Sequence, residues 1–156
     1  MILGIDPGVR KLGYSLIDKN LNINDAGILL LDQKGPQRLD QFTRILKIYE
    51  FFEDIVNNYE INKVGIEKLY FTKFNQSNAE FVYGIRGALI SMFIKKEIKI
   101  IEYTPIQLKK YITGNSKANK ILVQQIIMKI YGLEEMPEYD DAADALGLAY
   151  LAMRQN

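Results

Sequence analysis

Residues 1–18 read MILGIDPGVRKLGYSLID. The apolar and small residues 1–5 predict a buried strand, and Pro7 and Gly8 end that strand immediately after Asp6. The apolar residues of LGYSLID then predict a second strand that returns beside the first. A carboxylate therefore stands where a buried strand ends, in a chain that has no histidine to pair with it.

The rest of the chain alternates between strand-like and helix-like patterns. Apolar runs predict further strands over 21–32, 63–67 and 98–103. Helical spacing of apolar residues predicts helices within 35–60, 75–97, 104–112, 117–133 and the Ala-rich end of 134–153. Three consecutive strands followed by alternating helices and strands predict an α/β fold, a mixed sheet with helices on both faces.

Composition restricts the chemistry that is available. The chain has 156 residues, of which 48% are hydrophobic, so we expect one globular domain over 1–156. It has no cysteine and no histidine, which excludes disulfides, thiol nucleophiles, imidazole bases and the usual zinc ligands. No apolar run is long enough to span a membrane, and the N-terminus lacks the basic region of a secretory signal. We therefore expect a cytoplasmic protein without a membrane partner.

Charge is unevenly distributed although the net charge is only +1. Residues 1–60 carry a net charge of −2, residues 61–120 of +7 and residues 121–156 of −4. A basic middle segment between acidic ends fits a surface that binds a polyanion beside an acidic cluster. A lysine-rich surface that only faces solvent explains the same numbers equally well.

Four carboxylates are predicted to meet at one edge of the sheet. The first and fourth strands end in Asp6 and Glu67, and the long helix between them allows the two strands to lie parallel and adjacent. The last helix begins near DDAAD, where Asp141 and Asp144 are three residues apart and project from one face. Alanines around them allow that helix to approach the sheet closely.

Buried like charges repel each other, so either the pKa values of these acids rise or a cation neutralises the cluster. Oxygen ligands without histidine or cysteine suit Mg²⁺ or Mn²⁺, and two ions would activate water and stabilise the leaving oxygen of a phosphodiester. Each acid also has an ordinary interpretation. Asp6 can start a turn, and Glu67 can be a solvated residue at a strand end. Asp140 or Asp141 can cap the last helix, and Asp144 can be a first-turn acid that the helix dipole favours.

Five ordered blocks resemble one known family. GIDPG, GYSLID, GIEKLYF, GIRGA and DAADALGLA are similar to the blocks of the RuvC-type crossover junction endodeoxyribonucleases, the bacterial Holliday-junction resolvases. The resemblance covers essentially the whole chain. It implies an RNase H-like mixed five-stranded sheet of strand order 3-2-1-4-5, with helices on both faces.

The same resemblance implies a function in homologous recombination and DNA repair. Family members work as homodimers that use Mg²⁺ to nick two opposed strands of a four-way junction symmetrically, and they leave ligatable nicks. Their partners include a RuvA–RuvB-type branch-migration complex. For this chain we therefore expect the same substrate, the homodimer and Mg²⁺, which Mn²⁺ can replace, with two ions in each active site.

The resemblance also assigns residues. Asp6, Glu67, Asp141 and Asp144 match the catalytic, metal-binding acids, with Asp140 as a lesser candidate because the block begins with two aspartates. Many relatives have histidine where this chain has Asp141. Tyr70 and Phe71 match an aromatic that stacks on a base near the crossover, with ordinary core packing as the alternative. The DNA-binding lysines of the family's basic segment match Lys109, Lys117 and Lys120.

Two further features leave alternatives open. Gly84 and Gly87 lie on neighbouring turns of a predicted helix, and we expect them to allow close approach of another element or of a second subunit. The rival functions are an RNase H-like nuclease that acts on flaps or other branched nucleic acids, and a junction-binding protein that does not cleave. A kinase-like or chaperone-like relative of the same sheet topology is disfavoured by the short chain.

Overall fold

A five-stranded mixed sheet forms the centre of the structure, a computed structural model that describes residues 1–31, 37–68 and 76–156. The strands are β1 (Ile2–Asp6), β2 (Lys11–Ile17), β3 (Ile23–Leu30), β4 (Lys63–Glu67) and β5 (Lys99–Tyr103). Their order is β3-β2-β1-β4-β5, which confirms the predicted order. The pairs β1–β2 and β2–β3 are antiparallel, whereas β1–β4 and β4–β5 are parallel. The C-terminal ends of β1, β4 and β5 therefore share one edge of the sheet.

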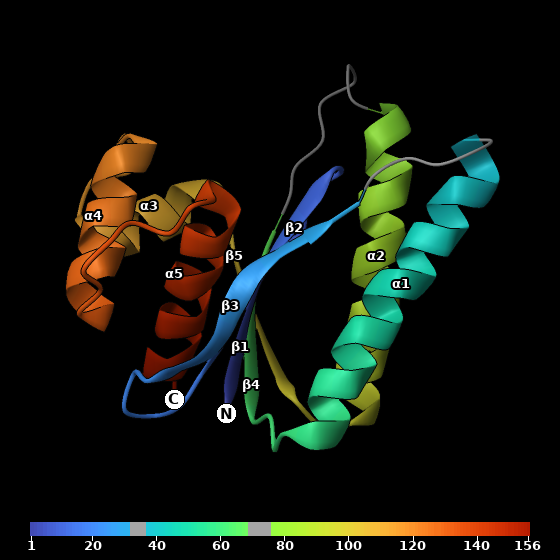
Figure 1. The fold of residues 1–156 in the computed structure, drawn as a ribbon, viewed down its shortest axis with the longest axis horizontal. Helices are drawn as coiled ribbons and strands as arrows, with labels where there is room; N and C mark the ends of the chain where they lie inside the picture. The colour runs from blue at the N-terminus through green and yellow to red at the C-terminus, as the bar shows by residue number, and fades with distance from the viewer. Residues whose placement is uncertain (32–36, 69–75) are drawn as a thin grey trace.

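Helices cover both faces of this sheet, as predicted (Figure 1). Two of them lie on one face, α1 (Gln37–Asn58) and α2 (Gln76–Lys95). The other face is covered by α3 (Pro105–Thr113), α4 (Lys120–Tyr131) and α5 (Asp140–Arg154). After β3 the chain runs through α1 and enters β4, which pairs with β1 in parallel.

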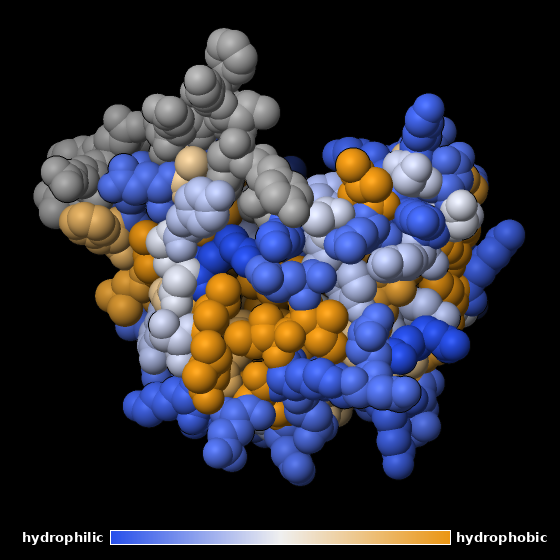
Figure 2. All heavy atoms as spheres, turned by 180° about the vertical axis from the view of Figure 1, so that it is seen from behind, coloured by the Kyte–Doolittle hydropathy of each residue, from blue (hydrophilic) through white to orange (hydrophobic). Residues whose placement is uncertain are grey.

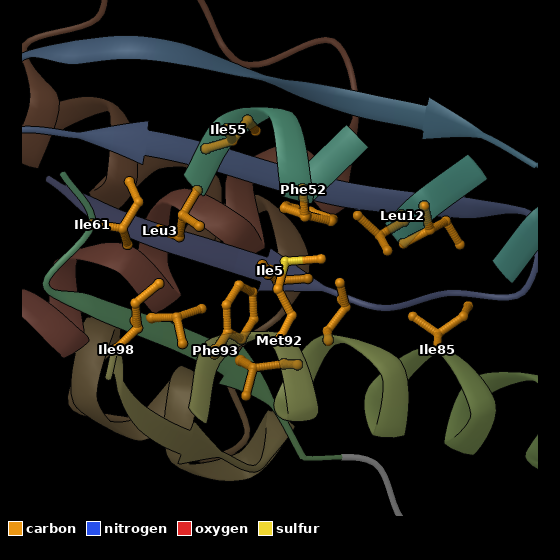
Figure 3. Packing of buried hydrophobic residues seen from close by; sticks show 14 of the residues in the cluster. Leu3, Ile5, Leu12, Phe52, Ile55, Ile61, Ile85, Met92, Phe93 and Ile98 are labelled. Atoms are coloured by element: carbon orange, nitrogen blue, oxygen red, sulfur yellow. The ribbon is translucent and has the colours of Figure 1, made fainter. Parts of the chain in front are cut away.

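Each face of the sheet has its own hydrophobic core. On the first face, Leu3 and Ile5 of β1 pack with Phe52 of α1 and with Met92 and Phe93 of α2 (Figure 3). On the second face, apolar residues of α3, α4 and α5 form a separate cluster against the sheet. Because β1 and β4 lie between the two cores, almost all their residues are buried.

Local capping determines where the helix next to the acidic edge begins. The side chain of Asn119 accepts a hydrogen bond from the backbone N–H of Leu122, which satisfies a donor in the first turn of α4. Gly132 ends the helix in the left-handed conformation (φ 64°) that glycine adopts without strain. Lys120 is consequently the first residue of α4 and faces the start of α5.

Three glycines allow α5 to lie directly on the sheet. They occupy the three neighbouring strands β2, β1 and β4, and a side chain at any of them would collide with the backbone of α5. A Cβ atom would lie 2.0 Å from the Asp141 carbonyl oxygen at Gly13, 1.8 Å from that of Ala145 at Gly4, and 2.3 Å from that of Leu148 at Gly65. We call these three residues the glycine track. Because the contacts fall on successive turns of α5, the track determines both the height and the register of this helix.

The two glycines of α2 have different surroundings. A Cβ atom at Gly84 would lie 2.9 Å from Cδ1 of Ile45, so this glycine allows α1 and α2 to pack closely. Gly87 is exposed, and no atom of the described residues would lie within 4 Å of its Cβ. The prediction of close approach within the chain is therefore confirmed for Gly84 alone.

We predict that Gly4→Ala destabilises the protein by about 3 kcal/mol, because the new methyl group must push the sheet and α5 apart. Gly27→Ala is the matched control, since a Cβ at that strand position would lie 3.4 Å from the Tyr14 hydroxyl and be tolerated. The control should change the free energy of unfolding by less than about 0.5 kcal/mol. Urea unfolding followed by circular dichroism measures both, and equal stabilities of the two variants would contradict the role of the track.

Candidate active site

Asp6 and Glu67 lie side by side at the ends of two parallel strands. Ile5 of β1 pairs with Ile66 of β4, so the next residue of each strand reaches the same edge of the sheet. Both carboxyl groups are buried, with 8% of each residue exposed. The two carboxyl groups act directly on each other. Two buried carboxylates repel each other when both are ionised, so a positive charge between them would be favourable.

The glycine track brings the acids of α5 to the same place. Gly13 of the track pairs with Asp6 across β1 and β2, and it lies against the backbone of Asp141. Asp144 follows three residues later on α5. The negative charges of Asp141 and Asp144 act on Glu67, and Asp6 interacts with both of them as well. The four predicted acids are therefore coupled electrostatically.

The start of α5 excludes the capping interpretation of Asp140 and Asp141. The residue before the first turn is Tyr139, and its side chain makes no capping hydrogen bond. Asp140 and Asp141 both lie inside the first turn, where the helix dipole favours negative charge. The helix dipole therefore stabilises the negative charges of Asp140 and Asp141 beside the sheet.

Burial and mutual repulsion disfavour the ionised forms of these acids. Burial raises the pKa of Asp6 well above its usual value, and the neighbouring Glu67 raises it further. Burial also raises the pKa of Glu67, and the negative charges of Asp144 and Asp141 raise it further. The hydrogen bond with Asp6 and the positive charge of Arg86 lower it in part. Burial followed by the charge of Asp6 raises the pKa of Asp144 to about 7. A cation at this site would relieve the repulsion.

The donor set fits a hard divalent cation. Asp6, Glu67, Asp141 and Asp144 offer only carboxylate oxygens, the ligands that Mg²⁺ and Mn²⁺ prefer. Within residues 1–31, 37–68 and 76–156, no three acidic side chains already surround one point closely enough to hold an ion. A bound cation would offset the repulsion between these carboxylates.

Lys120 is the predicted lysine that lies near the acids. Its ammonium group donates to Asp140 at 3.2 Å, and Gln124 Nε2 donates to the same carboxylate at 2.5 Å. The hydrogen bond and the charge of Asp140 raise the pKa of Lys120, which keeps it positively charged. The charge of Lys120 also acts on Asp6 and Asp144. Two residues of α4 therefore bind the Asp140 carboxylate.

Of the other predicted DNA-binding residues, Lys109 and Lys117 are described, and neither contacts this cluster. Lys109 is half-buried on α3, and Lys117 is exposed in the loop between α3 and α4. Tyr70 and Phe71 lie outside the described residues, so their stacking role stays a prediction.

Sequence reasoning missed the partner of Glu67 on α2. Arg86 is buried and donates from Nη1 to the main-chain oxygen of Glu67 at 2.5 Å. Its only signal in the sequence is its isolation, because it is the one charged residue in the helical stretch 81–93.

The fold and the site together define a nuclease of the RNase H-like class, with carboxylates clustered at the ends of two parallel strands. The chain belongs to the RuvC family of crossover junction endodeoxyribonucleases, whose model matches residues 2–151. Crossover junction endodeoxyribonuclease RuvC of Halothermothrix orenii is 35% identical over 96% of this chain and 89% of its own length. RuvC of Petrotoga mobilis is 36% identical over 96% of this chain and 91% of its own.

A solved structure has the same fold. RuvC of T. thermophilus in complex with a Holliday junction substrate superposes with a TM-score of 0.80 and 23% sequence identity. The match covers 95% of this chain and 88% of the other. The RNase H-like fold is thereby confirmed. No helix in the described part of the chain is long and apolar enough to cross a membrane.

We predict that Asp144→Asn stabilises the protein in EDTA at pH 8. The pKa of Asp144 is about 7 in the folded protein and near 3.8 in an unfolded chain, so the folded state binds more protons between those values. Its ionisation therefore lowers stability as pH rises from about 4 to 7, and the amide removes this loss. The gain should be on the order of 2–4 kcal/mol at pH 8 and vanish near pH 4.

Thermal unfolding across pH 4–8 measures the effect. Glu50→Gln, at an exposed position of α1, is the control and should show no gain at either pH. An Asp144→Asn variant that is less stable than the parent at pH 8 would show that Asp144 is not repelled by its neighbours.

Proposed function

We propose that this chain is a structure-selective endonuclease that resolves Holliday junctions in homologous recombination and DNA repair. It acts as a single cytoplasmic nuclease domain and nicks two opposed strands symmetrically, leaving ends that can be ligated. The observation that carries the proposal is the buried carboxyl pair of Asp6 and Glu67, coupled to the two acids of α5. Membership of the RuvC family supports the choice of substrate.

The acids are proposed to hold two Mg²⁺ ions, which Mn²⁺ can replace. Bound Mg²⁺ activates water for attack on a phosphodiester and stabilises the charge that develops on the leaving oxygen. Asp6 and Glu67 supply ligands from the rigid sheet, and Asp141 and Asp144 supply them from α5. The chain needs no histidine for this chemistry, because its carboxylates only have to bind the cation and orient it.

DNA binding is proposed to combine charge and stacking. Lys120 lies beside the acids and can contact the phosphate next to the scissile bond, whereas Lys109 and Lys117 extend the basic surface along α3 and the following loop. Tyr70 or Phe71 would stack on a base that is unpaired at the crossover, an interaction worth about 1–3 kcal/mol. Together they hold the junction open beside the active site.

A homodimer is proposed because the substrate has two opposed scissile strands. A two-fold dimer offers one active site to each strand. The outer side of α2 carries Tyr83, Gly87 and Ile94, which are exposed and spaced four and seven residues apart, so they form one stripe. Figure 2 shows that apolar side chains also gather at the middle of the face opposite to that of Figure 1.

A RuvA–RuvB-type branch-migration complex is the proposed partner.

We predict that Asp6→Asn, Glu67→Gln, Asp141→Asn and Asp144→Asn each slow junction cleavage in Mg²⁺ by at least about 100-fold. Junction binding in EDTA should stay or become tighter, since affinity for a polyanion rests on basic residues. Asp140→Asn, which weakens the contacts to Lys120 and Gln124 on α4, should cost much less than Asp141→Asn. Gel assays with labelled four-way junctions, flaps and duplexes measure both cleavage and binding.

The parent protein should cut the four-way junction at two symmetric positions and leave flaps and duplexes largely intact. Preferential cutting of flaps would favour the rival nuclease, and binding without cleavage in Mg²⁺ or Mn²⁺ would favour the non-cleaving protein. Near-normal cleavage by any one of the four acid variants would remove that residue from the site.

We predict that Ile94→Glu on the α2 stripe converts the dimer into a monomer, because it places a charge in an apolar interface. Lys95→Gln, the exposed neighbour that does not belong to the stripe, should remain dimeric. Sedimentation equilibrium at micromolar concentration measures this, with circular dichroism as the check on folding. A parent protein that stays monomeric both alone and on junction DNA would contradict the dimer.

A further inference from the structure

Arg86 is a charged residue in an otherwise apolar environment. It lies on α2, in the helical stretch FVYGIRGALISMF (81–93), and is 8% exposed. A buried guanidinium is costly unless partners satisfy its charge and its donors. The identity of those partners therefore indicates what the residue does.

Both partners lie on the sheet beside the candidate active site. Nη1 donates to the main-chain oxygen of Glu67 at 2.5 Å, and Nη2 forms an ion pair with the carboxylate of Glu102. Glu67 is the last residue of β4, and Glu102 lies on the neighbouring strand β5. One guanidinium thus bridges two parallel strands at the edge where the acids meet.

We propose that Arg86 is a positioning residue that holds the end of β4 so that the Glu67 carboxylate faces Asp6 and the bound metal. This inference rests on the proposed function, because it assigns Glu67 to a metal site. Arg86 acts through Glu67 and touches neither the substrate nor the metal itself.

The geometry explains why this end of β4 needs a support. The amide of Lys68 donates to the oxygen of Tyr103 at 2.7 Å, so the N–H after Glu67 is already held by β5. Arg86, which lies on α2, donates a hydrogen bond to the main-chain oxygen of Glu67. With both sides of this peptide group held, the Cα–Cβ bond of Glu67 has a fixed direction. A planar guanidinium can reach the oxygen and Glu102 together, whereas the point charge of a lysine cannot.

Electrostatics act in the same direction. Arg86 places a positive charge beside the end of β4, next to the acidic cluster. Glu102 balances part of that charge, which allows the guanidinium to remain buried.

A purely structural role predicts a different outcome from a positioning role. If Arg86 only joined α2 to the sheet, its loss would lower stability and leave metal affinity unchanged in the folded protein. If it positions Glu67, its loss weakens metal binding even in folded protein. Groups that orient metal ligands typically change metal affinity or activity by about 10–100-fold.

The test measures Mn²⁺ binding by isothermal titration calorimetry on the full chain without DNA. Arg86→Met should weaken Mn²⁺ binding by about 10–100-fold, and Arg86→Lys should restore only part of the affinity. Ile85→Val, at the buried neighbouring position on α2, is the control for lost packing and should bind Mn²⁺ like the parent. In junction cleavage, Arg86→Met should lower kcat with little change in KM, and added Mn²⁺ should recover part of the rate.

Parent-like Mn²⁺ affinity and kcat in a folded Arg86→Met variant would overturn the proposal. If that variant does not fold, Glu102→Ala decides, because Glu102 is partly exposed and its loss frees one side of the guanidinium. A several-fold loss of Mn²⁺ affinity in Glu102→Ala supports the proposal, and an unchanged affinity overturns it.

The Glu67→Gln variant separates this inference from the proposed function. If the parent binds Mn²⁺ and Glu67→Gln does not, the metal site stands and the Arg86 variants test positioning alone. A parent that binds no Mn²⁺ would contradict the proposed function together with this inference.

Discussion

The site depends on the contact between the backbone of α5 and the glycine track of the sheet. Gly13, Gly4 and Gly65 have no side chains, so the carbonyl groups of three successive turns of α5 lie where Cβ atoms would otherwise be. The buried hydroxyl of Ser15 adds a hydrogen bond of 2.8 Å to the oxygen of Ala145. A helix held this closely brings the acids of its first turns down to the end of β1. With larger residues on these strands, α5 would stand away from the sheet and the carboxylates would separate.

Packing and electrostatics oppose each other at this edge of the sheet. The packing of α5 forces Asp141 and Asp144 towards the buried pair of Asp6 and Glu67, although burial and repulsion raise the pKa values of three of these acids. The fold tolerates the repulsion because positive charges stand on two sides. Lys120 approaches from α4 and Arg86 from α2. Repulsion among these carboxylates lowers the stability of the fold, and a bound cation would restore it. Functional sites commonly reduce stability in this way.

Much of the fold could be predicted from the sequence because its patterns were locally consistent. The apolar run before Asp6, the crossover helix and the short run before Glu67 were enough to predict two parallel strands that end in acids. The spacing of Asp141 and Asp144 placed both on the first turns of a helix. The role of Asp140 could not be predicted, because neither its bond to Lys120 nor its bond to Gln124 follows from local spacing.

Residues whose role depends on tertiary contacts were harder to predict. Arg86 lies within the GIRGA block, but its role could not be predicted because its partners on β4 and β5 are far away in the sequence. Gly84 and Gly87 looked equivalent in the sequence, yet only Gly84 faces α1. The stacking roles of Tyr70 and Phe71 remain predictions.

If α5, held on the glycine track, completes a metal site with the ends of β1 and β4, crystals grown with Mn²⁺ at pH 8 should show this site by anomalous diffraction. We expect a manganese peak bonded to carboxylate oxygens of Asp6 and of at least one acid of α5. Manganese bound elsewhere on the chain, with none of these carboxylates among its ligands, would contradict it.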